Sequence, residues 1–245
     1  MKAIILAAGK GKRINSEEEN IPKHLRKVAG KPLLQYVLDA VNFIGKEDII
    51  IVVGFLKEKI MDAFPGYNFA VQDEILGTGH AVKCAKSKVG DYKGDVLVLL
   101  GDTPLLEKSS LEKLTQYHQE NKNQCTILSC QADKHMPLGR IVRDEKDCEK
   151  FCAIVEEKDC TPEQKNIREY NTGVMLFDSE KLFEELENLK NNNKSSEYYL
   201  TDVPSLFIEK NYKIGVYKSE NSNDIHGVNT VEDLQAAEKI LAEKS

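Results

Sequence analysis

Three features are missing from this sequence of 245 residues, and each absence narrows the class of protein. The six cysteines include no C-x-x-C pair, so their spacing fits neither a zinc site nor a disulfide framework and indicates free thiols. A signal peptide and an apolar run long enough to span a bilayer are both absent, which predicts a cytoplasmic protein with no membrane partner. The net charge is -6, with both signs scattered along the chain, which argues against a nucleic-acid partner.

The apolar runs that are present alternate with amphipathic stretches. Strands are expected at residues 2–8, 48–53, 68–71, 95–100, 124–131, 139–143, 151–157, 173–177 and 213–217. Helices are expected at residues 32–43, 56–64, 78–86, 179–189, 201–209 and 231–244. Runs that are apolar on both faces, such as residues 96–100, suit a parallel strand covered by helices on each side. We therefore predict an α/β fold with a mostly parallel central sheet and helices on both faces.

One loop after the first expected strand, GKGKR at residues 9–13, combines glycines with three cations. A dinucleotide fingerprint G-x-G-x-x-G and a Walker loop would each need another glycine where Ile14 stands, so neither motif fits, and a redox α/β protein is disfavoured. Glycines that let backbone N–H groups approach an anion, beside Lys10, Lys12 and Arg13, instead predict a different phosphate-binding loop. Ligands of such sheets bind beyond the carboxyl ends of the strands.

Six stretches, the first of which contains this loop, occur in the order found in one family. They are LAAGKGKR (6–13), PKHL with GKPLL (22–34), QDEILGTGHA (72–81), LGDTPLL (100–106), GRIVRD with IVEEKD (139–159), and EYNTGV through EYYLTDV to GVN (169–229). On these motifs the sequence resembles the sugar-1-phosphate nucleotidyltransferases, and more closely the uridylyltransferase half of the bacterial bifunctional enzyme that makes UDP-N-acetylglucosamine. The resemblance implies a Rossmann-like nucleotidyltransferase domain over residues 1–229, with a nucleotide-binding half (1–110), a sugar-binding half (111–229) and a C-terminal helix (230–245).

The reaction that this resemblance implies is attack of a sugar 1-phosphate on the α-phosphorus of a nucleoside triphosphate, which requires positioning and charge neutralisation. By match to the family, Arg13 and Lys23 are the catalytic candidates, since both cations suit phosphate oxygens. Asp102 ends a very apolar strand, and it would hold Mg²⁺ together with Asn229. Taken without the family, Lys23 is a surface cation and Asn229 a helix cap. The alternative for Asp102 is a turn cap before Pro104, but a carboxylate at the end of so apolar a strand itself suits Mg²⁺.

The resemblance also assigns the nucleotide and the sugar. The amide of Gln72 would pair with the Watson–Crick edge of uracil, and His80 in the same motif is interpreted as a structural residue near a helix start. Other nucleotide contacts match Leu6, Ala7, Ala8, Gly9, Gly11, Lys23, Gly77, Thr78 and Gly101. Positions that hold the sugar match Gly139, Glu156, Asn171, Tyr199 and Thr201. Among the sugar residues, Glu156 follows an apolar strand, where an inward carboxylate needs hydrogen-bond donors.

Three departures from the family pattern stand out. The acidic residues Glu17 to Glu19 lengthen the loop before Pro22, and we expect them to point into solvent. Leu100 replaces a frequent tyrosine, and Ser195-Ser196 replaces a usual Gln-Gly in the sugar-binding loop, which leaves the sugar open.

The function expected from the sequence is uridylyl transfer from UTP to N-acetylglucosamine 1-phosphate. The alternatives are another sugar 1-phosphate (glucose or N-acetylgalactosamine), a dTTP-using enzyme, or a non-catalytic nucleotide sensor. Because the sequence contains no hexapeptide repeat of an acetyltransferase β-helix, we expect neither acetyl-CoA activity nor a trimer, and the oligomeric state stays open.

Overall fold

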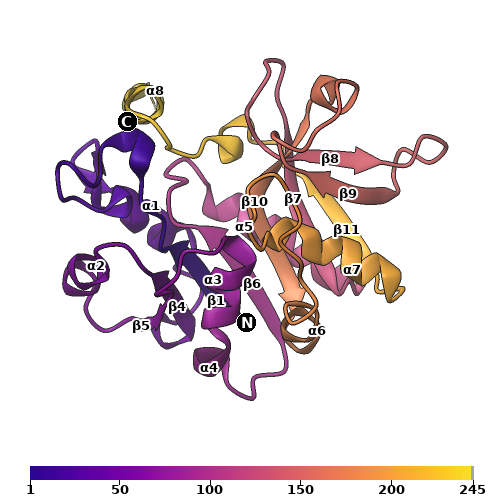
Figure 1. Ribbon diagram of the computed structural model, residues 1–245, viewed down its shortest axis with the longest axis horizontal. Helices are drawn as coiled ribbons and strands as arrows, with labels where there is room; N and C mark the ends of the chain where they lie inside the picture. Colours follow the sequence, from indigo (N-terminus) through magenta and orange to yellow (C-terminus); the bar gives the residue numbers. More distant parts are fainter. Residues whose placement is uncertain (244–245) are drawn as a thin grey trace.

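A computed structural model describes residues 1–243, and its centre is one sheet of nine strands (Figure 1). The strand order is β11-β7-β10-β6-β1-β4-β5, with β8 paired to β10 and β9 paired to β8. The strands are β1 (Lys2–Ala7), β4 (Ile49–Val53), β5 (Asn68–Val71), β6 (Asp95–Leu100), β7 (Cys125–Gln131), β8 (Arg140–Arg143), β9 (Phe151–Val155), β10 (Glu169–Asp178) and β11 (Ile214–Lys218). A separate ribbon joins β2 (Lys27–Val28) to β3 (Lys31–Pro32).

Most neighbouring strands on the central path of the sheet are parallel, as predicted. The pairs β1 with β4, β1 with β6, β4 with β5, and β7 with β11 are parallel, whereas β10 is antiparallel to both β6 and β7. Because β10 runs in reverse, its first residues lie at the carboxyl end of β6. Gly173 crosses that end with φ +83°, and a Cβ there would lie 2.4 Å from Leu100 Cδ1. A glycine is therefore required where β10 passes the end of β6.

Helices cover both faces of the sheet, which confirms the predicted α/β architecture. They are α1 (Leu33–Ala40), α2 (Lys57–Ala63), α3 (Thr78–Cys84), α4 (Lys86–Val89), α5 (Lys108–Asn121), α6 (Ser179–Glu185), α7 (Val203–Glu209) and α8 (Val231–Glu243). The residues of β1 alternate between two cores. Ile4 and Leu6 pack in the core that includes residues of α3, α6 and α7, whereas Ala3 and Ile5 pack in the core that includes residues of α1, α2 and α5.

Short 3-10 helices join several of these elements: η1 (Lys12–Ile14), η2 (Lys23–Leu25), η3 (Lys46–Asp48), η4 (Gln164–Asn166), η5 (Leu200–Asp202) and η6 (Ser222–Ile225). Helix α5 was not predicted, and β10 begins four residues before its expected start at residue 173. Within residues 1–243, no helix is both long and apolar enough to cross a membrane. All six cysteines are free thiols, as expected from their spacing.

The C-terminal helix returns to the N-terminal half of the chain. Leu234, Ala237 and Leu241 lie on the apolar face of α8, as predicted, and they pack in a cluster with Ile14 and Val28. Figure 1 shows α8 on the same side of the molecule as α1. Residues 244–245, the end of the expected helix, lie outside the described residues. The two proposed halves share one continuous sheet, because β6 of the first half pairs directly with β10 of the second.

Candidate active site

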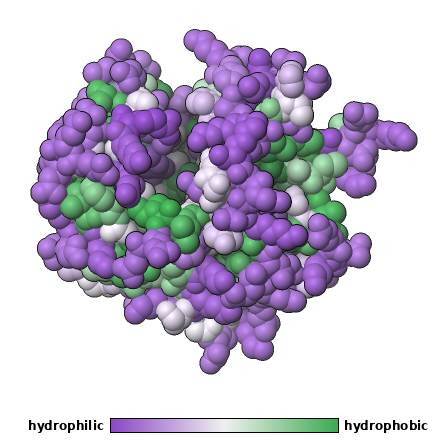
Figure 2. Space-filling model, in the orientation of Figure 1, coloured by the Kyte–Doolittle hydropathy of each residue, from purple (hydrophilic) through white to green (hydrophobic). Residues whose placement is uncertain are grey.

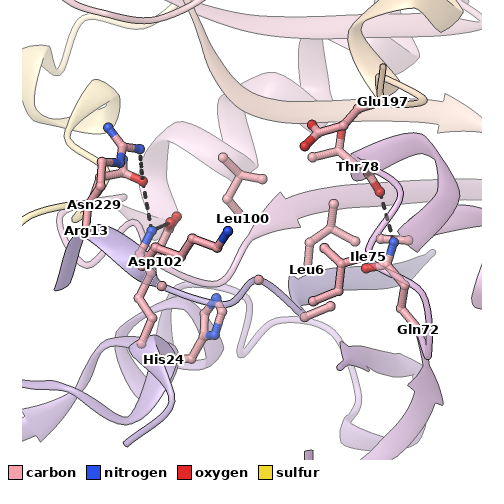
Figure 3. Close-up of a pocket in the computed structure, with 17 residues that line it drawn as sticks. Leu6, Arg13, His24, Gln72, Ile75, Thr78, Leu100, Asp102, Glu197 and Asn229 are labelled. Carbon is pink, nitrogen blue, oxygen red and sulfur yellow. Dashed lines mark hydrogen bonds and ion pairs between the residues drawn. The ribbon is translucent and has the colours of Figure 1, made fainter. Parts of the chain in front are cut away.

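A cleft of about 310 Å³ lies at the carboxyl ends of β1 and β6. The space-filling view shows a hollow between the two halves of the molecule (Figure 2). Predicted residues that line the cleft are Leu6, Ala8, Gly9, Gly11, Arg13, Lys23, Gln72, Gly77, Thr78, Asp102 and Asn229. Figure 3 places Arg13, Asp102 and Asn229 at one end and Gln72 and Thr78 at the other. Ala7 and Gly101, both buried, do not line it.

The loop after β1 is shaped by Gly11. This residue has φ +60°, and a Cβ there would lie 2.5 Å from Ser16 Oγ, so a larger residue would be strained and crowded. The turn leads into η1 and brings Arg13 Nη2 to 3.2 Å from Asn229 Oδ1. Glu17, Glu18 and Glu19 are exposed, as expected. The hydrogen bond from Arg26 lowers the pKa of Glu19, so one of the three carboxylates is held away from the cleft by a cation.

Three residues far apart in the sequence form the charged end of the cleft. Lys23 Nζ makes an ion pair with Asp102 Oδ2 and lies 3.0 Å from Asn229 Oδ1. The backbone fixes this meeting, because Val228 N–H donates to the Asp102 carbonyl at 2.9 Å. Asp233 Oδ2 accepts a hydrogen bond from Asn229 N–H at 2.8 Å and holds the start of α8. Lys23 is only 7% exposed, so it is not a surface cation.

His24 lies beside this group and was not predicted as a site residue. It lines the cleft and is 4% exposed, and its Nδ1 has no hydrogen-bond partner among the described residues. Burial lowers the pKa of His24 to about 4, although the charge of Asp102 acts in the opposite direction. The imidazole is therefore neutral at neutral pH. The position of His24 in the PKHL motif could have marked it as a site residue, but its burial cannot be deduced from the sequence.

The two oxygens of Asp102 have different surroundings. Oδ2 pairs with Lys23, whereas Oδ1 is buried and has no hydrogen-bond partner in the described part of the chain. A carboxylate oxygen without a partner beside the amide oxygen of Asn229 is a donor set that suits a hard divalent cation. Residues 1–243 contain no group of three His, Cys, Asp or Glu side chains that could hold a metal. Phosphate oxygens would have to complete such a site.

The opposite end of the cleft is built around Gln72, which is 2% exposed. Its Nε2 lies 3.0 Å from the Gly77 carbonyl oxygen and 3.0 Å from His80 Nδ1. Gly77 has φ +110°, and a Cβ there would lie 2.6 Å from the Tyr198 carbonyl oxygen. The backbone of the EYYLTDV motif therefore lies directly on the start of α3. His80 therefore contacts Gln72, the residue expected to bind the base. The sequence-based interpretation of His80 as a structural residue did not include this contact.

The predicted sugar residues form a group outside the cleft lining. Thr201 Oγ1–H donates to Glu156 Oε1 at 3.0 Å, and Asn171 N–H donates to the Gly139 carbonyl at 2.8 Å. Burial raises the pKa of Glu156, while the hydrogen bond from Thr201 acts against that rise. Glu156 and Tyr199 line a second cavity, of about 420 Å³.

Within the same sugar-loop motif, only Glu197 lines the cleft itself. Glu197 and three apolar lining residues, Ile75, Ala81 and Leu100, were not predicted as site residues. Ile75 and Ala81 lie in the QDEILGTGHA motif and Leu100 in LGDTPLL, so the motifs marked the segments without showing which side chains face the cleft.

Two solved structures share this architecture. A Bacillus anthracis protein named as a glucose-1-phosphate thymidylyltransferase, in complex with sucrose, matches with a TM-score of 0.78 and 21% identity, over 98% of this chain and 94% of that one. A UDP-glucose pyrophosphorylase complexed with UDP-glucose matches with a TM-score of 0.79 and 19% identity, over 100% and 99% of the two chains. At these identities the comparison establishes the nucleotidyltransferase fold.

Residues 3–200 match the family of the MobA-like NTP transferase domain, and the chain belongs to this family. The bifunctional protein GlmU of Alkaliphilus metalliredigens is 42% identical over 242 residues, which is 98% of this chain and 52% of that protein. GlmU of Streptococcus mutans is 41% identical over 240 residues, or 98% and 51%. The chain spans about half the length of the curated relatives that it matches. These relatives confirm the resemblance found in the motifs.

Proposed function

We propose that this protein transfers a uridylyl group from UTP to N-acetylglucosamine 1-phosphate and releases pyrophosphate. One observation carries the proposal: Arg13, Lys23, Asp102 and Asn229 converge at one end of a cleft that has Gln72 at its other end. A nucleotide with its base at Gln72 would direct its phosphates toward the cationic end. The family and the motif resemblance supply the class of reaction, and the cleft supplies a place for it.

In this proposal the chain acts by positioning and by charge. Arg13 and Lys23 bind phosphate oxygens and stabilise the charge that moves onto the leaving pyrophosphate. Lys23 has to exchange part of its contact with Asp102 for the phosphate, and its ammonium can do so because it is a point charge on a flexible stem. The backbone of the loop at Gly9 and Gly11 adds N–H donors. No covalent intermediate on the protein is needed.

A divalent cation fits beside these residues, and we propose Mg²⁺ held by Asp102 and Asn229. When bound, Mg²⁺ supplies neutralising charge to the triphosphate. The buried Asp102 Oδ1, which has no hydrogen-bond partner in the described structure, is the observation that supports this assignment. The presence of Lys23, Asp102 and Asn229 together also argues against a non-catalytic sensor, because nucleotide binding alone does not need all three residues.

The sugar assignment rests on a different group of residues. Glu156 and Thr201 are hydrogen-bonded to each other, and with Gly139, Asn171 and Tyr199 they are proposed to bind the sugar hydroxyls and the acetamido group. Glucose 1-phosphate and N-acetylgalactosamine 1-phosphate remain the alternatives, because Ser195-Ser196 changes the sugar-binding loop. A cytoplasmic location and the absence of a trimer stay predictions.

Pyrophosphate release tests the proposal. The purified protein is assayed with UTP, dTTP, CTP and GTP, each against the 1-phosphates of N-acetylglucosamine, glucose and N-acetylgalactosamine. UTP with N-acetylglucosamine 1-phosphate should give the highest kcat/KM, and Lys23→Ala should lose about a hundredfold or more of it, as expected for removal of a transition-state charge. Equal turnover with glucose 1-phosphate would overturn the sugar assignment only. If a folded protein releases no pyrophosphate with any pair of substrates, the proposed enzyme activity is wrong and the non-catalytic nucleotide sensor is the remaining alternative.

A further inference from the structure

We infer that His80 is a positioning residue that holds the Gln72 amide in the orientation that selects a base with an N3–H donor, as in uracil. The inference rests on the proposed function, because it concerns how the same cleft chooses its nucleotide. His80 lies in α3, eight residues after Gln72, and does not line the cleft itself. Its contact is to the amide that faces the base site.

The orientation of the amide follows from the Gly77 carbonyl. This oxygen can only accept a hydrogen bond, so the atom of Gln72 that lies 3.0 Å from it must be the NH₂ group. The same NH₂ group lies 3.0 Å from His80 Nδ1, which therefore has to be the acceptor. Both N–H donors of the amide are then used on the protein. Its oxygen is left turned toward Leu6 and Ile75, inside the cleft (Figure 3).

The proton on the imidazole is placed by the same contacts. If Nδ1 accepts, a neutral His80 carries its proton on Nε2. Cys84 Sγ lies 3.9 Å from Nε2, one helical turn further along α3, and offers a weak acceptor for it. A chain of contacts thus runs from Cys84 through His80 to Gln72. In it, His80 Nε2–H faces the Cys84 sulfur, and His80 Nδ1 accepts a hydrogen bond from the Gln72 NH₂ group.

A fixed amide oxygen distinguishes the pyrimidines. Uracil presents an N3–H donor at the centre of its Watson–Crick edge, whereas cytosine presents an N3 lone pair there. The Gln72 oxygen accepts from the first and repels the second. If the amide turned over, its NH₂ group would favour cytosine, but its oxygen would then face both the Gly77 carbonyl and His80 Nδ1. Thymine has the same edge as uracil, so His80 does not separate UTP from dTTP.

The test compares two substitutions at one position. His80→Leu keeps an apolar volume and removes the acceptor, whereas His80→Asn can return an oxygen close to the position of Nδ1. The kcat/KM for UTP divided by that for CTP should fall about tenfold in His80→Leu, mainly through KM for UTP, because one of two hydrogen bonds that fix the amide is lost. His80→Asn should keep the ratio within about threefold of the parent. Lys83→Ala, on the same helix but paired with Glu187, is the control and should leave the ratio unchanged.

A purely structural role for His80 gives a different result: His80→Leu would lower kcat/KM for both nucleotides together at a constant ratio, and that outcome overturns the inference. A second measurement needs neither a variant that folds well nor a substrate. Nitrogen-15 NMR of the histidine rings in the parent should show His80 with its proton on Nε2, and a proton on Nδ1 at neutral pH overturns the inference as well. Failure of the parent to use UTP would instead contradict the proposed function and leave the NMR result standing.

Discussion

Asp102→Asn is the most direct test of the charged end of the cleft. Asp102 is the ion-pair partner of Lys23, and the two side chains are 14% and 9% exposed. The second contact of the ammonium, Asn229, is neutral, so the variant leaves this cation with amide oxygens alone. Removing one partner of a buried pair costs about 3–5 kcal/mol. Because asparagine still accepts a hydrogen bond and the pair is partly solvated, we expect the free energy of unfolding to fall by about 1–3 kcal/mol.

The effect of Asp102→Asn on turnover should be larger than its effect on stability. The variant keeps the shape of the side chain and removes the negative charge that orients Lys23 and that would hold the cation. Loss of one preorganised electrostatic group costs about 10²- to 10³-fold in kcat. At about 1.4 kcal/mol per tenfold, that is roughly 3–4 kcal/mol of the activation barrier. The KM for UTP should change less than kcat, since in the proposed function Arg13 and the glycine loop also bind the triphosphate.

The assay is pyrophosphate release at saturating Mg²⁺, with urea unfolding followed by circular dichroism on the same samples. Asp48→Asn is the matched control. Asp48 also pairs with a lysine, Lys2, at 2.7 Å, but it precedes β4 at the opposite edge of the sheet from the cleft. Its turnover should equal that of the parent. A folded Asp102→Asn protein with turnover within about threefold of the parent would refute the reasoning, since the effect expected for such a group is far larger.

Three further predictions concern the neighbouring groups. Gly77→Ala should lower the free energy of unfolding by about 1–3 kcal/mol, since it strains a φ of +110° and presses a Cβ on the Tyr198 carbonyl; urea unfolding measures this, and an unchanged midpoint would contradict the crowding. Glu156→Gln should raise stability at pH 7, because burial raises the pKa of Glu156 and penalises its charge, and it should raise KM for the sugar phosphate about tenfold. Greater stability with an unchanged KM would remove Glu156 from the sugar site. His24 has its folded pKa lowered to about 4, so the unfolded chain binds the extra proton, and stability that is complete above pH 6.5 falls as pH drops toward 4. From pH 7 to pH 5 the parent should lose about 2 kcal/mol through this group, and His24→Gln should lose correspondingly less; equal slopes of unfolding free energy against pH would show that His24 is not the cause.

The apolar strands were predictable because burial on both faces leaves a continuous run such as residues 96–100. The helix α5 was not, because its buried side includes Ser110 and His118 beside Leu111 and Leu114, which weakens the apolar periodicity. The early part of β10 was missed for a related reason. Asn171 and Thr172 are buried polar residues, and each is also bonded to a distant segment: Thr172 Oγ1–H donates to the Leu128 carbonyl at 2.9 Å and Asn171 N–H to the Gly139 carbonyl at 2.8 Å.

Some residues of the candidate site were likewise predictable from the sequence, and others were not. Family motifs located Lys23, Asp102 and Asn229. Only Asp102 closely follows a strand of the sheet, so the rule that ligands bind at the carboxyl ends of strands predicts its place alone. The meeting of Lys23 and Asn229 with Asp102 depends on the turn at η2 and on the backbone hydrogen bond from Val228 to Asp102. The roles of His24 and His80 depend on burial and on contacts across a turn that no spacing in the sequence encodes. The contact of His80 with Gln72, for example, depends on the positive φ of Gly77 and on the start of α3 that follows it.

The return of the chain to its own beginning has a consequence for synthesis on the ribosome. Lys23 and Asn229 are 206 positions apart, and Arg13 and Asn229 are 216 apart. At about 5–20 residues per second, the glycine loop at residues 9–13 leaves the ribosome roughly ten to forty seconds before the asparagine that contacts Arg13 and Lys23. During that interval β1 also lacks β6, the strand beside it in the finished sheet, for the time taken to make nearly a hundred residues. Until β6 is made, the strand pairs available to the chain are those of β1 with β4 and of β4 with β5, and the contacts of Asn229 can form only after nearly the whole described chain has been synthesised.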